Sequence, residues 1–259
     1  MTTEAVPTNV EQHPHPIADA RRNECPFFDE REMLPPTNEY VCWIDVMGSQ
    51  NVMLRSIRIA SNFLMKLHIA ALTASNTPVS TVELYPIIDG IYVCSPNQSH
   101  ILNFLKKVYS ALAVTFILEE DPFHRFQIRS GLAYGPIVKG EGTLGCAAEL
   151  RNHPDHARRI LLGPTLTQAY QIEKQSAPFG VALHESVRTF APPRGVLMFG
   201  TYWKWWKLHL QPDDDGLASE LSSSLQDHYQ WCLNHTVALS YNEWDINRHK
   251  HLAEEYFSE

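Results

Sequence analysis

The sequence predicts an α+β domain in which a mixed β-sheet is flanked by helices. Its hydrophobic patterns follow the order strand, helix, two strands, helix, strand, and further helices and strands come after them. Apolar residues alternate in the expected strands and recur three and four residues apart in the expected helices. This order around a mixed sheet is typical of a ferredoxin-like, palm-type core.

The first strand and helix show these patterns most clearly. Over about 39–46 the side chains of Val41, Trp43 and Asp45 point to one face of the strand, because successive residues alternate. In chain order we expect a strand at 39–46, a helix at 49–75, two strands within 81–95, a helix at 97–119, a strand at 126–138, a helix at 163–177, a short strand and helix within 180–191, and a hairpin at 195–210.

Composition divides the chain into three parts. Residues 1–37 are rich in proline, charge and amide, which predicts an N-terminal arm that is poorly ordered or lies over the domain. Residues 38–212 carry the alternating strand and helix patterns, and we expect them to form the main domain. Residues 213–259 begin with three consecutive aspartates and a glycine, and their pattern predicts a helical C-terminal extension.

The bulk properties exclude several classes of protein. The 259 residues are 44% hydrophobic, enough for a substantial core, and the net charge of −8 argues against binding to a nucleic-acid duplex. The five cysteines include no CxxC pair, so we expect reduced thiols in a cytoplasmic protein, without a disulfide framework or zinc site. The start lacks the features of a secretion signal, and no stretch approaches the length of a membrane span, so no membrane insertion is expected.

Two aspartates are candidate ligands of a divalent cation. Asp45 ends the first strand, and Asp89 lies at the Asp-Gly turn of the following hairpin. The first strand commonly lies beside such a hairpin, so the two carboxylates can meet at one end of the sheet, where they suit Mg²⁺ or Mn²⁺. The simpler alternatives are that Asp89 only forms a turn and that Asp45 only caps the next helix.

An ordered set of motifs resembles the class III nucleotidyl cyclase catalytic domain over roughly 39–210. The set consists of WIDVMGS with the first Asp, YPIIDGIYV with the second, the glycine-containing IRSGLAYGPIVKGEG, and LLGPTLTQAYQIEKQSA followed by a Pro-x-Gly turn. The resemblance implies the ferredoxin-like cyclase fold, two divalent cations, Mn²⁺ or Mg²⁺, and a homodimer whose sites combine residues of both subunits.

The departures from that family concern the base. Tyr85 stands where purine cyclases usually carry a base-reading Lys or Glu, and Ile160 replaces a usual Asp. Thr167 and Gln171 replace the family's transition-state Asn and Arg. In this respect the chain resembles the pyrimidine cyclases of the bacterial Pycsar anti-phage system, which implies UTP or CTP as substrate, with UTP favoured, and a cyclic monophosphate as second messenger.

The resemblance also implies a role for each candidate residue. Asp45 and Asp89 would hold the ions, with the carbonyl of Val46 completing one shell. Gly48, Ser49 and Gln50, in the turn into the helix, would face the triphosphate, and Lys204 near the terminal hairpin would bind it. Further cations that can replace the missing Arg are Arg129, Arg158, Arg159 and Lys207, each of which is otherwise a solvated surface residue.

Two other hypotheses remain open at this stage. A catalytically inactive cyclase-like domain that binds a nucleotide or a protein partner is favoured by Thr167 and Gln171, whereas the retention of both aspartates favours an enzyme. A diguanylate cyclase shares the palm-type core, but IIDGIYV stands where that family carries its GG[DE]EF hairpin.

Overall fold

The computed structural model describes residues 28–76, 81–190, 200–207 and 215–258, and the first 27 residues of the predicted 1–37 arm lie outside them. The strands are β1 (Thr37–Val46), β2 (Glu83–Ile87), β3 (Gly90–Ser95), β4 (Ile128–Lys139), β5 (Leu161–Leu162), β6 (Val181–Leu183) and β7 (Tyr202–Trp203). The α-helices are α2 (Ser49–Arg55), α3 (Ile57–Ser75), α4 (Gln98–Leu118), α5 (Ala148–Asn152), α6 (Pro154–Ala157), α7 (Pro164–Glu173), α8 (Glu185–Thr189), α9 (Asp215–Leu233), α10 (Thr236–Leu239) and α11 (Glu243–Ser258). Short 3-10 turns occur at η1 (Glu30–Glu32), η2 (Pro122–His124) and η3 (Gly140–Thr143).

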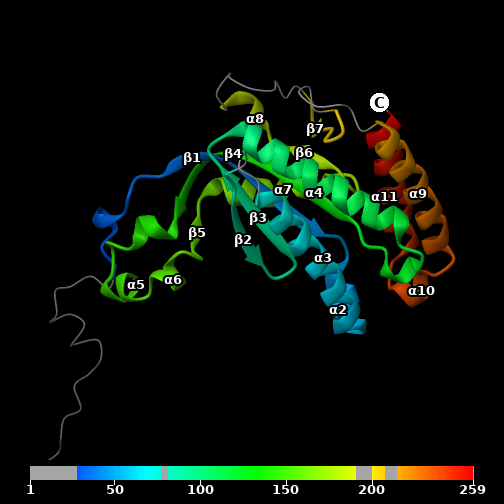
Figure 1. Ribbon diagram of the computed structural model, residues 1–259, viewed down its shortest axis with the longest axis horizontal. Helices are drawn as coiled ribbons and strands as arrows, with labels where there is room; N and C mark the ends of the chain where they lie inside the picture. The colour runs from blue at the N-terminus through cyan, green and yellow to red at the C-terminus, as the bar shows by residue number, and fades with distance from the viewer. Residues whose placement is uncertain (1–27, 77–80, 191–199, 208–214, 259) are drawn as a thin grey trace, which may run out of the picture.

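The described strands form one mixed sheet in the order β2-β3-β1-β4-β6-β7, and β5 pairs with the far end of β4 (Figure 1). β4 and β6 run parallel, and every other pair is antiparallel. The first four strands and their two helical crossovers have the ferredoxin-like arrangement, with the first strand between the hairpin and the fourth strand. The predicted α+β class, with a mixed sheet flanked by helices, is therefore confirmed.

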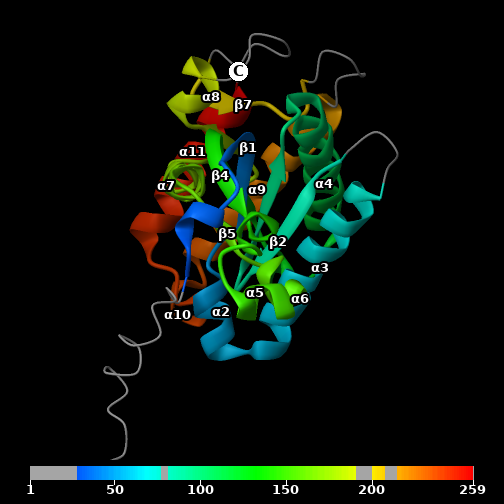
Figure 2. The same ribbon diagram turned by 90° about the vertical axis from the view of Figure 1, so that its left-hand side faces the viewer.

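Helices cover both faces of the sheet. α3 and α4 lie on one side, and α7 lies on the other, against β1 and β4 (Figure 2). The alternation along β1 divides its side chains accordingly: Tyr40, Cys42 and Ile44 enter the core under α3 and α4, whereas Val41 and Trp43 pack toward α7. Asp45 continues the second series, so its carboxylate lies on the α7 face of the sheet.

The C-terminal extension is helical, as predicted, and shares the core of the domain. α9 and α11 lie side by side, and α9 packs on α4 (Figure 1). Leu225 and Tyr229 on α9 and Ile246 on α11 are buried in the same cluster as the α3–α4 face. Tyr256 donates a hydrogen bond to the carbonyl oxygen of Trp203 at 2.6 Å, which ties α11 to β7.

The expected helix at 49–75 is two helices. Ser56 has an extended backbone, with φ of −156°, and its hydroxyl accepts a hydrogen bond from the Ile59 amide at 3.3 Å. A side-chain cap of this kind starts a new helix, because it satisfies an amide that the preceding turn leaves unpaired. α2 is therefore a separate seven-residue helix beside the end of β1.

The hairpin turns one residue earlier than its Asp-Gly pair suggests. Ile88 adopts a left-handed backbone with φ of 39°, and β3 already begins at Gly90. A Cβ added at Gly90 would stand 2.4 Å from the carbonyl oxygen of Ile44 and against the Trp43 ring. Glycine therefore allows β3 to lie close to β1 beside Asp45.

Of the described helices, α4 alone is long and apolar enough to cross a membrane by length and composition. This corrects the expectation that no stretch approaches that length. More than half of the helix is buried inside the fold, against α3, α9 and β3. Its apolar character therefore serves the core of the domain.

Candidate active site

Asp45 and Asp89 lie together at one end of the sheet. Asp45 pairs in register with Gly90 on β3, the neighbour of Asp89, and with Arg129 on β4. The amide of Val46 donates a hydrogen bond to the carbonyl oxygen of Asp89 at 3.4 Å. The expected meeting of the first strand and the hairpin therefore brings both acids to the same place.

The turn after β1 places Ser49 against the second acid. Gly48 adopts a left-handed backbone with φ of 72°, which glycine does without strain, and it precedes α2 without a side-chain cap. The Ser49 hydroxyl donates a hydrogen bond of 2.7 Å to Oδ2 of Asp89. Ser49 thus fixes the Asp89 carboxylate across the turn and does not cap the helix.

A single cation faces the acids from β4. Nη2 of Arg129 lies 3.7 Å from Oδ2 of Asp45, and the same guanidinium forms an ion pair with Glu173 at the end of α7. Glu173 is only 1% exposed. Two carboxylates therefore share one guanidinium in a largely buried place, and the charge of Asp89 acts on Asp45 from the neighbouring turn.

Burial and the neighbouring acids change the protonation of Asp45. Its pKa is raised to about 8, first by burial and then by the charge of Glu173, and the nearby Arg129 opposes the rise. Burial also raises the pKa of Glu173, again against the effect of Arg129. A divalent cation next to these groups would favour the ionised carboxylates, because it supplies the missing positive charge.

The residues fit a site for Mg²⁺ or Mn²⁺. The carboxylates of Asp45 and Asp89 and the carbonyl of Val46 offer the hard oxygen ligands that these ions prefer. Within the described parts of the chain, no group of three or more His, Cys, Asp and Glu residues can hold a metal ion. The remaining ligands would have to be water or substrate oxygens, which is how Mg²⁺ is commonly held beside phosphates.

The acids open into a cavity of about 470 Å³. This volume lies in the range of roughly 300–1,000 Å³ that is common for small-molecule sites. The candidate residues from the sequence that line it are Asp45, Val46, Gly48, Ser49, Gln50, Asp89 and Arg129. Among the proposed cations, Arg129 is the one that the fold brings to the acids.

Tyr85 lies behind the cavity. It pairs in register with Tyr92, which does line the cavity, and it is buried with Trp43 and Ala169 on the α7 face. Its hydroxyl donates a hydrogen bond of 2.8 Å to Glu83. Tyr85 does not pack on α3, because α3 covers the opposite face of the sheet.

Thr167 and Gln171 lie on the exposed side of α7. Tyr170 and Lys174 share that side, since residues three and four apart on a helix are neighbours, and both line the cavity. The ammonium of Lys174 stands 4.5 Å from the centre of the Tyr170 ring. Thr167 and Gln171 are thus beside the cavity mouth but outside its wall.

Five other candidates lie apart from the acids within this chain. Ile160 and the neighbouring Arg158 and Arg159 follow α6, where Arg158 pairs with Asp155 at 2.9 Å. Lys204 follows β7, three strand positions from β1, which is roughly 14 Å across a sheet. Lys207 lies three residues further along the chain.

Eight residues of the cavity wall are not among the candidates from the sequence. They are Trp43, Asn51, Ile87, Ile88, Tyr92, Tyr170, Glu173 and Lys174. Trp43 could have been found, because it stands two residues before Asp45 on the same face of the strand. Its ring lies 4.6 Å from that of Tyr92 and 6.2 Å from that of Tyr170. The position of Glu173 depends on how α7 crosses the sheet, for which the sequence carries no local signal.

No model of a known protein family matches the sequence, and no curated protein matches it. Among solved structures, the guanylyl cyclase domain of the RhoGC fusion protein from the aquatic fungus Blastocladiella emersonii is similar, with 16% identity, a TM-score of 0.44, and coverage of 61% of this chain and 88% of that one. The guanylate cyclase domain of RhGC from Catenaria anguillulae, in complex with GTP, shows 17% identity, a TM-score of 0.45, and coverage of 61% and 84%. An adenylate/guanylate cyclase/hydrolase from Silicibacter pomeroyi shows 14% identity, a TM-score of 0.43, and coverage of 64% and 87%. These values describe a distant likeness, so the function is argued below from the geometry of the site.

Proposed function

We propose that this chain is a nucleotidyl cyclase that converts a nucleoside triphosphate to its 3′,5′-cyclic monophosphate and pyrophosphate. The observation that carries the proposal is the meeting of Asp45 and Asp89 at one end of the sheet, with Arg129 beside them, in a cavity of about 470 Å³. Two carboxylates that can bind divalent cations, next to a guanidinium, suit a substrate with a polyphosphate chain.

In the proposed reaction the ribose 3′-oxygen forms a bond to the α-phosphorus, and the bond from that phosphorus to the bridging oxygen of pyrophosphate breaks. The 3′-hydroxyl proton passes to water. Two divalent cations, Mn²⁺ or Mg²⁺, would activate the attacking oxygen and neutralise charge on the phosphates. Asp45 and Asp89 would hold them, and Ser49 would keep the Asp89 carboxylate in place through its 2.7 Å hydrogen bond.

Arg129 is the cation that we assign to the phosphates. The transition state gathers negative charge on the phosphate oxygens, so a fixed donor beside the acids stabilises it. Arg129 already lies 3.7 Å from Asp45 and is held from behind by the buried Glu173. Glu173 would thus act as a positioning residue that aims the guanidinium.

The finer proposal concerns the base, for which we favour a pyrimidine and UTP over CTP. Trp43, Tyr92 and Tyr170 line the cavity and offer aromatic surfaces on which a base can stack. Tyr85 supports Tyr92 from behind, so a large residue at 85 would keep the base end of the cavity short. The choice of UTP rests on the resemblance of the sequence to the pyrimidine cyclases, which also suggests a messenger in anti-phage defence.

A homodimer with composite sites belongs to the same proposal. Thr167 and Gln171 lie on the exposed side of α7 next to the cavity mouth. From there they can reach a neighbouring subunit. Lys204, which is distant from the acids of its own chain, would then serve the site of the partner.

A catalytically inactive domain that binds a nucleotide is the second candidate. It is favoured by the two replacements on α7. Thr167 lacks the amide of the family's Asn, and Gln171 lacks the guanidinium of the family's Arg. It is also favoured by the ion pairs that already engage Arg129. Such a domain would bind nucleotide in the same cavity without releasing pyrophosphate.

Incubation with each of the four ribonucleoside triphosphates and Mn²⁺ separates these proposals. The cyclase proposal expects a cyclic monophosphate and an equal amount of pyrophosphate, with UTP turned over fastest. Binding of a triphosphate without any product would support the inactive domain instead. Linear or cyclic dinucleotides as products would overturn both.

A further inference from the structure

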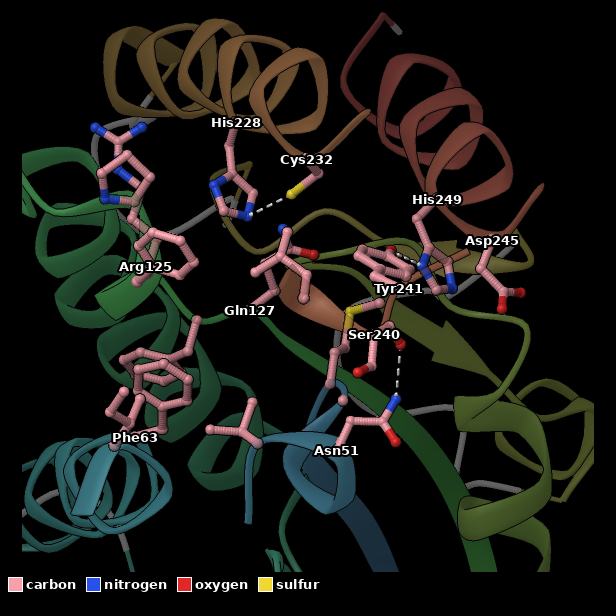
Figure 3. Close-up of a pocket in the computed structure, with 18 of the residues that line it drawn as sticks. Asn51, Phe63, Arg125, Gln127, His228, Cys232, Ser240, Tyr241, Asp245 and His249 are labelled. Carbon is pink, nitrogen blue, oxygen red and sulfur yellow. Dashed lines mark hydrogen bonds between the residues drawn. The ribbon is translucent and has the colours of Figure 1, made fainter. Parts of the chain in front are cut away.

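A second cavity, of about 430 Å³, lies between the sheet core and the C-terminal helices. Its walls come from the end of β1 with α2 and α3, from the segment between η2 and β4, and from α9, α10 and α11 (Figure 3). Asn51 on α2 donates a hydrogen bond of 3.3 Å to the carbonyl oxygen of Ser240. The cavity therefore exists only because the C-terminal extension closes over the core.

The cavity wall carries guanidiniums that are not paired with carboxylates, two of which, Arg125 and Arg248, lie over the rings of Phe116 and Trp244. Arg55, Arg125 and Arg248 each donate to a backbone carbonyl oxygen, those of Ala238, Glu119 and Lys174. None of the three forms an ion pair with a carboxylate among the described residues. The only carboxylate of the wall is Asp245, and Asn242 already donates to it. Several guanidiniums around one cavity, with so little counter-charge, favour a bound anion.

One ring nitrogen of a buried histidine in the wall lacks a hydrogen-bond partner. His228 on α9 is 7% exposed and projects into the cavity (Figure 3). Its Nε2 shares a 3.4 Å contact with the thiol of Cys232, but its Nδ1 has no hydrogen-bond partner. A buried polar atom of this kind costs stability unless something bonds to it, which points to a ligand that reaches the ring.

Part of the wall is apolar and aromatic. Phe63 on α3 and Phe126 stack with their ring centres 5.2 Å apart, and Val52 and Ile59 also line the cavity. Such a surface takes up a planar or apolar group, because it removes that group from water. The cavity therefore combines apolar surface with cationic groups.

We infer that this cavity binds a small amphipathic anion, with a planar or apolar body against Phe63 and Phe126 and an acidic group held by Arg55, Arg125 and Arg248. The Nδ1 atom of His228 would make a further hydrogen bond to the ligand. This site is separate from the triphosphate cavity and needs the C-terminal helices, which the proposed catalytic reaction does not use.

Arg129 connects the two cavities. Together with Gly48 and Asn51 it lines both of them. An anion in the second cavity would therefore attract the same guanidinium that pairs with Asp45 and Glu173. Occupation of the second site would thus affect the catalytic site through Arg129, which the two cavities share.

Binding of naphthyl phosphate by the full chain tests the inference, with naphthol and inorganic phosphate as probes that lack the acidic group or the ring. Calorimetry should show one naphthyl phosphate per chain and at least tenfold weaker binding of both other probes. Arg125→Gln and Arg248→Gln should each weaken binding roughly tenfold or more, because each removes a charged hydrogen-bond donor. Arg58→Gln is the matched control, since Arg58 is exposed on α3 outside the cavity and should leave binding unchanged.

Two further variants test which of the two cavities binds the ligand. Asp89→Asn alters only the triphosphate cavity and should leave naphthyl phosphate binding intact, whereas His228→Asn should weaken it. Loss of binding in Asp89→Asn together with normal binding in Arg248→Gln would locate the probe in the catalytic site and overturn the inference. Equal binding of naphthol and naphthyl phosphate would overturn it as well, since the arginines would then play no part.

Discussion

Asp45 on β1 lies directly across from Arg129 on β4, with 3.7 Å between Oδ2 and Nη2, at the place where β3 brings Asp89 to the same end of the sheet. The pair provides the two kinds of group that a site for polyphosphate needs, one negatively and one positively charged. The carboxylate can hold a divalent cation, and the guanidinium can bind phosphate oxygens. In the free protein the guanidinium opposes the rise in the pKa of Asp45, and both groups face the cavity that would hold substrate and metal.

Mn²⁺ should stabilise the wild-type protein, because the ion would relieve the repulsion among Asp45, Asp89 and Glu173. At a hundredfold excess over Kd the expected rise in Tm is roughly 5–10 °C. Asp45→Asn and Asp89→Asn should each lose most of this rise, as measured by calorimetry in the presence and absence of the ion. Asp155→Asn, at an exposed carboxylate, is the matched control and should keep it. A full rise in both site variants would refute the assignment of these two acids to the metal.

Two buried histidines should each lower the free energy of unfolding as the pH falls from about 6.5 to about 4, which opposes the contribution of Asp45, whose raised pKa makes the folded chain the better proton acceptor in this range. Burial and the charge of Arg125 lower the pKa of His228 to about 4. Burial and the charges of Arg129 and Arg248 lower the pKa of His249 to about 4, against Asp245. Both rings stay neutral in the folded chain while they take up protons in the unfolded chain, so their contribution is complete above pH 6.5 and is lost toward pH 4.

Each ring accounts for roughly 3 kcal/mol over that range. Urea unfolding at several pH values should show that His228→Leu and His249→Leu each flatten the decline. His156→Gln, at an exposed ring, should not alter its slope. A slope that is the same in the wild type and in both buried-site variants would contradict the prediction.

Mixing two inactive variants should restore activity if the sites are composite. Asp89→Asn removes a ligand of the metal, and Gln171→Ala changes the exposed side of α7, so a mixed dimer would keep one site with both residues intact. Turnover of UTP by the mixture should exceed that of either variant alone, and light scattering should show a dimer at micromolar concentration. A monomer with full activity, or a fully active Gln171→Ala, would rule out composite sites.

Tyr85→Ala should relax the exclusion of ATP and GTP, because it removes the ring that supports Tyr92. The same change should cost a few kcal/mol of stability as a large-to-small substitution in a buried cluster. Tyr85→Phe keeps the ring and loses the hydrogen bond to Glu83, so it should cost about 1 kcal/mol and keep the order of substrates. Competition among the four triphosphates measures that order. An unchanged order in Tyr85→Ala would remove Tyr85 from base selection.

The periodic parts of the sequence predicted the fold well, because alternation and helical spacing depend on local burial. The pairing of Asp45 with the hairpin follows from the order of strands and was predictable for the same reason. The break at Ser56 was not, since the apolar positions continue through it and the hydroxyl cap depends on local geometry. The turn at Ile88 was missed because a β-branched residue rarely adopts a positive φ.

The site was predictable only where its residues lie on the two expected strands and the turn between strand and helix. The ion pair between Arg129 and Glu173 depends on the angle at which α7 crosses β1 and β4, and no local pattern encodes that angle. The second cavity was missed for a similar reason. His228, Tyr241 and His249 come together with α2 only when the C-terminal helices pack on the core.

The turnover of UTP by the wild type, by Asp45→Asn and by Asp89→Asn in saturating Mn²⁺ tests the central claim most directly. We expect the wild type to release cyclic monophosphate and pyrophosphate in equal amounts. Both variants should remain folded by circular dichroism and lose at least a hundredfold in rate, because each lacks one ligand of the metal. Asp155→Asn should match the wild type. Turnover within twofold of the wild type in either site variant would contradict the claim that these two carboxylates hold the metal ions that the reaction needs.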